Sequence, residues 1–139
     1  MGNKPAWLFR QSAVIPFTED NGVVKIVLVS SRSKNGWVIP KGVVERFMTP
    51  EDSAAKEALE EAGVIGNVSS EELIEYTYEK WGGTCTVKVY PLCVTQVLDS
   101  WDEQSTRDRV IVELPEAIEL VKPELKHVVP EISKFIKKE

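Results

Sequence analysis

Apolar and β-branched residues at the start of the chain follow a pattern typical of strands. Residues 6–17 are rich in apolar side chains, and residues 23–30 read VVKIVLVS, a run of the β-branched residues that favour extended backbone. Between them, residues 18–22 contain Asn21-Gly22, a strong signal for a tight two-residue turn. The pattern therefore predicts a β-hairpin.

A helix is predicted over residues 50–62, because both of its ends carry strong signals. Thr49 is a good N-cap residue, Pro50 suits the first helical position, and the acidic residues that follow are favourable near a helix N-terminus. Gly63 suits the left-handed conformation that ends many helices. Several apolar positions of this helix are alanines, so it can pack closely on a sheet while its glutamates face a cleft.

The middle of the chain predicts a second hairpin. Residues 72–81 and 84–97 read as long strands, and Gly82-Gly83 between them indicates a turn. Pro91 has no backbone N–H to donate, so it predicts an edge position or a bulge in the second of these strands.

The last part of the chain predicts a strand and two helices. Residues 99–108 read as a polar loop, 109–113 as a strand, 114–121 as a short helix, and 124–138 as an amphipathic helix. The inward positions of that last helix are Leu125, Val128, Val129, Ile132 and Ile136. The order of strands, helix, strands and helices favours an α/β or α+β fold with a mixed sheet over a regular βαβ repeat.

Length and charge narrow the classes of partner. The chain has 139 residues, which suits a single domain over residues 1–139. A net charge of −5 argues against a nucleic-acid partner, but a small anionic ligand fits if a local basic pocket exists. No stretch approaches the ~20 apolar residues of a membrane span, so we expect no membrane partner. The N-terminus has no apolar core of signal-peptide length, so we expect a cytoplasmic location.

The cysteines and the single histidine exclude several kinds of site. Cys85 and Cys93 lie in one strand-like segment, which would place their Cα atoms roughly 26 Å apart. A disulfide requires Cα atoms within ~7 Å, so we expect free thiols unless the strand folds back. With His127 as the one histidine, a multi-histidine zinc site cannot be built. Among metal sites, this composition therefore favours one built from carboxylates.

Three carboxylates share one face of the helix predicted over residues 50–62. Glu57, Glu60 and Glu61 are spaced i, i+3 and i+4, where like charges repel by roughly 0.2–0.5 kcal/mol per exposed pair. A bound hard cation such as Mg²⁺ or Mn²⁺ would offset this repulsion, and both ions take oxygen ligands. For an isolated pattern of this kind, a solvated acidic face is the more common explanation.

The residues around this helix resemble the signature of the Nudix family. That signature is a glycine, a spacer and then Arg-Glu-apolar-x-Glu-Glu-x-Gly-apolar. The residues that match at the family's spacing are Gly42, Glu57, Ala58, Glu60, Glu61, Gly63 and Val64. Lys56 stands where the family usually has arginine, and Met48 stands where it usually has glutamate. Glu45 and Glu51 are the nearby carboxylates that would replace the one missing at Met48.

The resemblance implies a Nudix fold, a mixed sheet held between helices. It also implies a pyrophosphohydrolase that uses Mg²⁺, or Mn²⁺, to cleave a diphosphate bond. Glu57, Glu60 and Glu61 are implied as catalytic and metal-binding residues, with the backbone carbonyl of Lys41 as a further ligand. Arg32, Lys41, Arg109 and Arg10 are implied as substrate-binding residues.

Residues 27–32, 37–40 and 101–118 are also similar to small Nudix enzymes that cut diadenosine polyphosphates and diphosphoinositol polyphosphates. The implied substrate is therefore one of these molecules or another nucleoside diphosphate derivative, acted on by a monomer or homodimer. The alternative is a Nudix-fold module that binds a phosphorylated ligand without cleaving it, which the departures at Met48 and Lys56 would favour.

Overall fold

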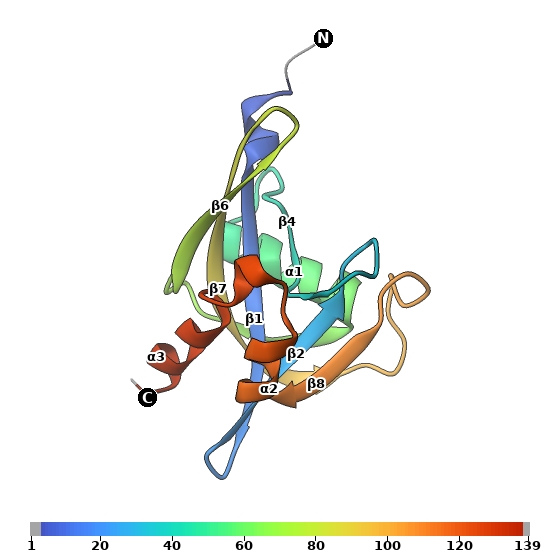
Figure 1. Ribbon diagram of the computed structural model, residues 1–139, viewed down its shortest axis with the longest axis vertical. Coiled ribbons are helices and arrows are strands. Elements are labelled where there is room, and N and C mark those ends of the chain that lie inside the picture. Colours follow the sequence, from blue (N-terminus) through green and yellow to red (C-terminus); the bar gives the residue numbers. More distant parts are fainter. Residues whose placement is uncertain (1–3, 138–139) are drawn as a thin grey trace.

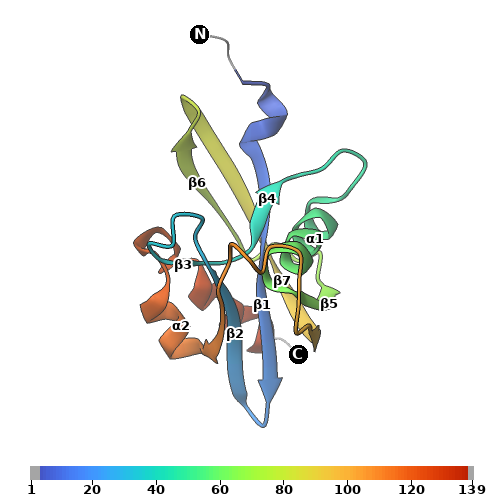
Figure 2. The ribbon, with the colours of Figure 1, turned by 90° about the vertical axis from the view of Figure 1, so that its right-hand side faces the viewer.

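The computed structural model describes residues 4–137, which form one mixed β-sheet with helices on both faces (Figures 1 and 2). The strands are β1 (Arg10–Asp20), β2 (Val23–Ser30), β3 (Trp37–Val38), β4 (Lys41–Val43), β5 (Val64–Val68), β6 (Ile74–Lys80), β7 (Gly83–Val97) and β8 (Arg109–Glu113). The α-helices are α1 (Pro50–Ala62), α2 (Leu114–Leu120) and α3 (Ile132–Lys137). Short 3-10 helices are η1 (Ala6–Phe9), η2 (Pro123–Leu125) and η3 (Val129–Glu131). The predicted fold class, with a mixed sheet, is confirmed.

Strands β1 and β7 run parallel at the centre of the sheet, paired from Arg10 with Thr86 to Phe17 with Cys93. The first predicted hairpin is confirmed, since β2 returns antiparallel to β1 through Asn21-Gly22, whose φ angles are 53° and 82°. The strand begins at Arg10 and not at residue 6, because the preceding residues form η1.

The outer edges of the two central strands are each shared by two partners. On the edge of β1 that faces away from β7, β4 pairs with residues 11–13 and β2 pairs with residues 17–20. On the far side of β7, β6 pairs with residues 83–89 and β5 with residues 92–97. Strands β4 and β6 thus extend toward one end of the molecule, where the sheet leaves room for a cavity beside α1.

Pro91 lies inside the central strand β7, so the predicted edge or bulge at this position is wrong. It pairs with Ile15 of β1, and its carbonyl oxygen accepts a hydrogen bond from the backbone N–H of Ser69 at 3.0 Å. A residue's N–H and C=O point to the same side of a strand, so the missing N–H of Pro91 faces the connection between β5 and β6. No ladder hydrogen bond is lost there. The bulge lies at Ile65/Gly66 instead.

The second hairpin is confirmed between β6 and β7, but its turn lies one residue earlier than predicted. Trp81 and Gly82 occupy the turn with φ angles of 57° and 74°, and Gly83 already belongs to β7. A tryptophan therefore adopts a left-handed conformation at the hairpin tip, which glycine would adopt more easily.

Helix α1 has the predicted ends. The Thr49 hydroxyl accepts from the backbone N–H of Asp52 at 3.1 Å, and Gly63 is left-handed with φ 65°. Its alanines pack with Val14, Val27 and other sheet residues on one face of the sheet. On the other face, Ile15, Leu28 and their neighbours pack against the C-terminal helices.

The C-terminal segment is not the single helix predicted over residues 124–138. It is divided into η2, η3 and α3, because Pro130 cannot continue an α-helical hydrogen-bond ladder. The predicted inward positions are nonetheless buried or partly buried, and Leu125, Val128 and Val129 belong to the core. Lys138 lies outside the described residues. In the described chain, no helix has the length and apolar character needed to cross a membrane.

Candidate active site

A cavity of about 630 Å³ opens between α1, strands β4 and β6, and the segments that follow β2 and α2. Its acidic side is formed by Glu57 and Glu61 of α1, together with Glu45 from the loop before that helix. Basic side chains line other parts of the wall. These are Arg32, Lys41, Lys80, Arg107 and Lys122. The cavity thus places carboxylates and cations around a single space.

The helical pattern predicted that Glu57, Glu60 and Glu61 all face a cleft, and two of them, Glu57 and Glu61, line this cavity. Glu61 is 3% exposed, and a Cβ built on Gly42 would overlap the carboxylate of Glu57. The glycine in β4 therefore leaves the space that this carboxylate occupies. This gives a physical reason for the fixed distance between Gly42 and Glu57 in the sequence.

Glu60 points elsewhere. Its Oε2 lies 3.4 Å from Nζ of Lys56, and it does not line the cavity. Lys56 also donates to Glu45 at 2.8 Å, so the lysine that replaces the usual arginine bridges two carboxylates. Within residues 4–137 no three His, Cys, Asp or Glu side chains lie close enough together to form a metal site as they stand.

Of the two carboxylates considered as replacements at Met48, only Glu45 lines the cavity. Met48 itself lies in the loop between β4 and α1, where its backbone N–H donates to the carbonyl of Glu45 at 3.2 Å. Glu51 belongs to the first turn of α1 and is not part of the cavity wall. The loop therefore brings Glu45 near the position at which the family signature has glutamate.

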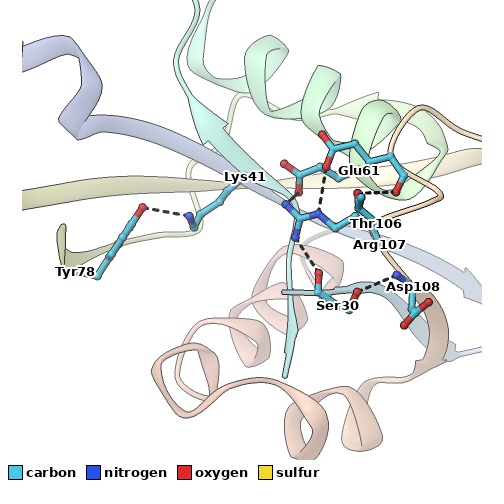
Figure 3. Close-up of polar contacts among 8 residues, drawn as sticks. Ser30, Lys41, Glu61, Tyr78, Thr106, Arg107 and Asp108 are labelled. Carbon is cyan, nitrogen blue, oxygen red and sulfur yellow. Dashed lines mark hydrogen bonds and ion pairs between the residues drawn. The ribbon is translucent and has the colours of Figure 1, made fainter. Parts of the chain in front are cut away.

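Arg107 is a buried residue of the site that the sequence gave no reason to select. Its Nη2 lies 3.7 Å from Oε1 of Glu61, its Nε lies 3.2 Å from Oε1 of Glu103, and its Nη1 donates to the carbonyl of Ser30 at 2.8 Å (Figure 3). The guanidinium therefore joins α1, the loop before β8 and the end of β2. An arginine within a polar loop has no sequence signal that distinguishes it from a solvated one.

Glu103 is a second residue that sequence reasoning missed. Its backbone N–H donates to the carbonyl of Glu60 at 2.9 Å, which fixes the 99–108 loop against α1. Its negative charge contributes to raising the pKa of both Glu57 and Glu61. The loop thus adds a carboxylate close to the acidic face of the helix.

The two cavity-facing glutamates have raised pKa values. Burial raises the pKa of Glu61 to about 8, although the Arg107 guanidinium opposes this shift. Burial also raises the pKa of Glu57, while its hydrogen bond with Glu61 lowers it. The pair is therefore able to hold a proton near neutral pH, and the two titrations are linked. A divalent cation would compete with that proton, since it binds ionised carboxylates.

Lys41 is held on the opposite wall by a chain of hydrogen bonds. Its Nζ donates to the Tyr78 hydroxyl at 3.1 Å (Figure 3). That hydroxyl donates to Oε1 of Gln11 at 2.7 Å. Burial lowers the pKa of Lys41, and the charge of Glu61 partly restores it. Since Lys41 forms no ion pair within the described chain, its ammonium is available to an anion in the cavity.

The predicted substrate-binding arginines fall in different places. Arg32 lines the cavity and forms no ion pair among the described residues. Arg109 does not line it, because its Nη1 donates to the carbonyls of Ala62 and Leu98, both at 2.9 Å. The Arg109 guanidinium also lies 4.1 Å from the ring centre of Trp101. Arg10 is exposed at the start of β1, outside the cavity wall.

Comparison with known families decides the classification. A family model described as the NUDIX domain matches residues 8–132. The chain belongs to the NUDIX family. This confirms the resemblance carried by residues 42–64.

The NUDIX chain is similar to curated relatives that are longer. Nudix hydrolase 16, mitochondrial, of Arabidopsis thaliana is 34% identical over 110 residues, which are 73% of this chain and 61% of the relative. Diphosphoinositol polyphosphate phosphohydrolase 2 of Rattus norvegicus is 30% identical over 94 residues, 68% of this chain and 51% of the relative. The chain therefore spans between half and two thirds of the length of these two relatives.

The fold is similar to that of solved NUDIX structures. An Ap4A hydrolase binary complex from Caenorhabditis elegans superposes with a TM-score of 0.75 at 20% sequence identity, covering 94% of this chain and 98% of that one. At this identity the match establishes a shared fold. It confirms the mixed sheet between helices that the family resemblance implied.

Proposed function

We propose that this NUDIX chain is a metal-dependent hydrolase that cleaves a diphosphate bond. The substrate classes that fit are diadenosine polyphosphates, diphosphoinositol polyphosphates and other nucleoside diphosphate derivatives. The observation that carries the proposal is the composition of the cavity wall. Two glutamates on α1, the buried Glu61 and the partly buried Glu57, face this space. The space is also lined by cations that have no ion-pair partner among the described residues, namely Arg32, Lys41, Lys80 and Lys122. A polyanion held by cations beside metal-binding carboxylates fits this arrangement.

The donor set suits a hard divalent cation such as Mg²⁺. Glu57 and Glu61 supply carboxylate oxygens, Gly42 leaves the room in which Glu57 lies, and the backbone carbonyl of Lys41 is the further ligand we propose. When bound, the cation neutralises phosphate charge and lowers the pKa of a coordinated water. Glu60 would join this set only by leaving Lys56, so we assign it a smaller contribution.

The remaining residues of the site would bind the substrate's phosphates or orient the glutamates. Lys41, held by Tyr78, and Arg32 would contact phosphate oxygens, because both present unpaired cationic groups to the cavity. Arg107 would keep Glu61 in position through its contacts with Glu103 and Ser30. Burial raises the pKa of Glu57 and of Glu61, so either could accept a proton from an attacking water once a bound cation has displaced the proton that the pair holds.

A second candidate function is phosphate-ligand binding without hydrolysis. It is favoured by the ion pair between Glu60 and Lys56, which withdraws one signature carboxylate from the cavity, and by Met48 in place of a glutamate. Against it, a binding module has no need to place the partly buried Glu57 beside the buried Glu61. Their mutual repulsion is a cost that only a proton or a cation relieves.

A substrate panel separates the two functions. It contains diadenosine polyphosphates, diphosphoinositol polyphosphates, nucleotide sugars and nucleoside triphosphates, each incubated with Mg²⁺, with Mn²⁺ or with a chelator. The hydrolase proposal expects product from at least one substrate only when a divalent cation is present. Saturable binding of a panel member with no product under any condition would support the binding module instead.

A further inference from the structure

The exposed aromatic side chains of this chain gather at one end. Among residues 4–137, the exposed large aromatics are Trp7, Phe47 and Trp81, with exposed fractions of 57%, 98% and 38%. The other exposed large hydrophobic residues of the described chain are aliphatic. Trp7 belongs to η1, Phe47 to the loop between β4 and α1, and Trp81 to the turn between β6 and β7.

These three segments lie next to one another in the fold. Phe9 of η1 makes an edge-to-face contact with Trp81, with ring centres 5.9 Å apart. The backbone N–H of Val44, where the loop toward α1 begins, donates to the carbonyl of Arg10 at 3.1 Å. Both ribbon views place η1, the β6–β7 turn and the β4–α1 loop at the end opposite the Asn21-Gly22 hairpin (Figures 1 and 2). We call these segments, residues 4–10, 44–48 and 79–84, the aromatic end.

Two of the three aromatic residues adopt strained backbone conformations. Phe47 has a φ angle of 67° and Trp81 one of 57°, a region that residues with large side chains rarely occupy. Despite that, the Phe47 ring is almost fully exposed, so burial within this chain does not offset the strain. Strain at exposed residues is a reason to look for a function outside the fold.

The aromatic end is basic although the chain is acidic. Its segments contain Lys4, Arg10, Arg46 and Lys80 but only Glu45 and Glu79, whereas the whole chain has 17 Lys and Arg against 22 Asp and Glu. Glu45 is paired with Lys56, and Glu79 accepts a hydrogen bond from Thr84. The Arg46 guanidinium lies 5.4 Å from the ring centre of Phe47, and Nζ of Lys80 lies 4.6 Å from that of Trp81. Arg46 and Lys80 are therefore each adjacent to an exposed ring.

From this arrangement we infer that the aromatic end docks on an anionic lipid membrane surface. Tryptophan and phenylalanine rings on loop tips enter the headgroup region, and lysine and arginine beside them pair with anionic lipids. The acidic remainder of the chain is repelled by the same surface, so charge fixes the orientation. The expectation of no membrane partner rested on the lack of a spanning segment. Surface docking needs only exposed rings and cations.

The membrane surface fits these observations better than two other occupants. A symmetric dimer through this end would bring two basic ends together, which charge opposes. A single-stranded nucleic acid would need a basic groove along which successive bases stack, and the rings here project from three separate tips. Trp81, Lys80 and Glu45 also line the cavity, so docking would bring the cavity rim close to the lipid surface. The inference does not depend on whether the cavity hydrolyses a substrate.

Co-sedimentation with lipid vesicles tests this inference. The full chain is mixed with vesicles of phosphatidylcholine alone or of phosphatidylcholine with phosphatidylserine, at low and at physiological salt. Variants of the aromatic end are Trp7→Ser with Phe47→Ser, and Arg46→Glu. The matched control is Val23→Ser with Ile111→Ser, since these residues are exposed to 41% and 40% outside the aromatic end. Circular dichroism melting checks that every variant is folded.

Binding to the phosphatidylserine vesicles, weakened by about tenfold or more in both variants of the aromatic end and unchanged in the control, is the expected result. Absence of binding to these vesicles, or equal binding by the Trp7/Phe47 variant and the control, would overturn the inference. So would loss of self-association or of single-stranded RNA binding in the same variants when no vesicle binding occurs.

Discussion

Nη2 of Arg107 lies 3.7 Å from Oε1 of Glu61, and both side chains are almost completely buried. The separation is long for an ion pair, and burial still raises the pKa of Glu61 to about 8. Arg107 therefore does not neutralise Glu61 fully. The carboxyl group therefore keeps a proton at neutral pH unless another cation enters the cavity.

Replacing Arg107 should destabilise the protein. Arg107→Met leaves Glu103 without its buried partner and removes the hydrogen bond to the Ser30 carbonyl, which we expect to cost about 1–3 kcal/mol of unfolding free energy. The control is Lys134→Met, since Lys134 forms an exposed ion pair with Glu131 and should change stability by less than about 0.5 kcal/mol. Urea unfolding measures both. Equal stability of the two variants would contradict the assigned role.

The stability of the metal-free protein should fall as pH rises through the neutral range. Glu61 has an ordinary pKa in the unfolded chain and one of about 8 in the folded protein. Between these values the folded state binds the extra proton, so raising the pH favours unfolding. Glu61→Gln removes this proton, and its unfolding free energy should depend less on pH over that window. Parallel pH dependence of the two proteins would show that the Glu61 pKa is not raised.

The Tyr78 hydroxyl should matter through Lys41. Tyr78→Phe removes the acceptor that holds Nζ of Lys41 at 3.1 Å, so we expect KM to rise by about tenfold with a smaller change in kcat. Tyr90→Phe is the control, because Tyr90 is buried in the core away from the cavity. Steady-state kinetics on the best substrate measures KM and kcat separately for both variants. A change in kcat alone would assign Tyr78 a different role.

Arg32 and Arg109 should behave differently when replaced. Arg32→Ala should raise KM with little effect on stability, because Arg32 lines the cavity without an ion-pair partner in the described chain. Arg109→Ala should lower stability by about 1–3 kcal/mol, because two backbone carbonyls lose their donor and Trp101 loses a cation over its ring. Thermal melting and kinetics on both variants test this. A selective KM effect in Arg109→Ala would return it to the substrate-binding set.

The sequence was most informative where local chemistry decides the structure. The caps at Thr49 and Gly63 define α1 because cap preferences are properties of single residues. The first hairpin was predictable from its turn residues for the same reason, whereas the turn of the second was misplaced by one residue because Trp81 takes a left-handed conformation. The prediction of an edge or a bulge at Pro91 was wrong because a proline fits inside a sheet where its missing N–H faces no partner strand. At Pro91 that condition is met by the gap between β5 and β6, which the sequence does not reveal.

The candidate site was predictable where it follows a periodic pattern or a family motif, as for Glu57 and Glu61 on the helix and for Arg32 and Lys41 beside the cavity. Helical spacing placed Glu57 and Glu61 on one face, but it could not show that Glu60 turns toward Lys56. Arg107 and Tyr78 reach the cavity from a loop and from β6, through tertiary contacts that leave no pattern in the sequence. The family resemblance implied Arg109 and gave no reason to select Arg107, because no local feature of the sequence tells which guanidinium faces the cavity.

The turnover of the Glu61→Gln variant tests most directly the claim that the cavity cleaves a diphosphate bond with a divalent cation held by Glu61. The rate of diphosphate cleavage on the best substrate is measured against Mg²⁺ concentration for the native protein, for Glu61→Gln and for the control Glu116→Gln on the exposed side of α2. We expect Glu61→Gln to lose about 10²–10⁴ of the Mg²⁺-dependent rate, with the control unchanged. A Glu61→Gln protein that cleaves the substrate at the native rate, with the same dependence on Mg²⁺, would contradict the account.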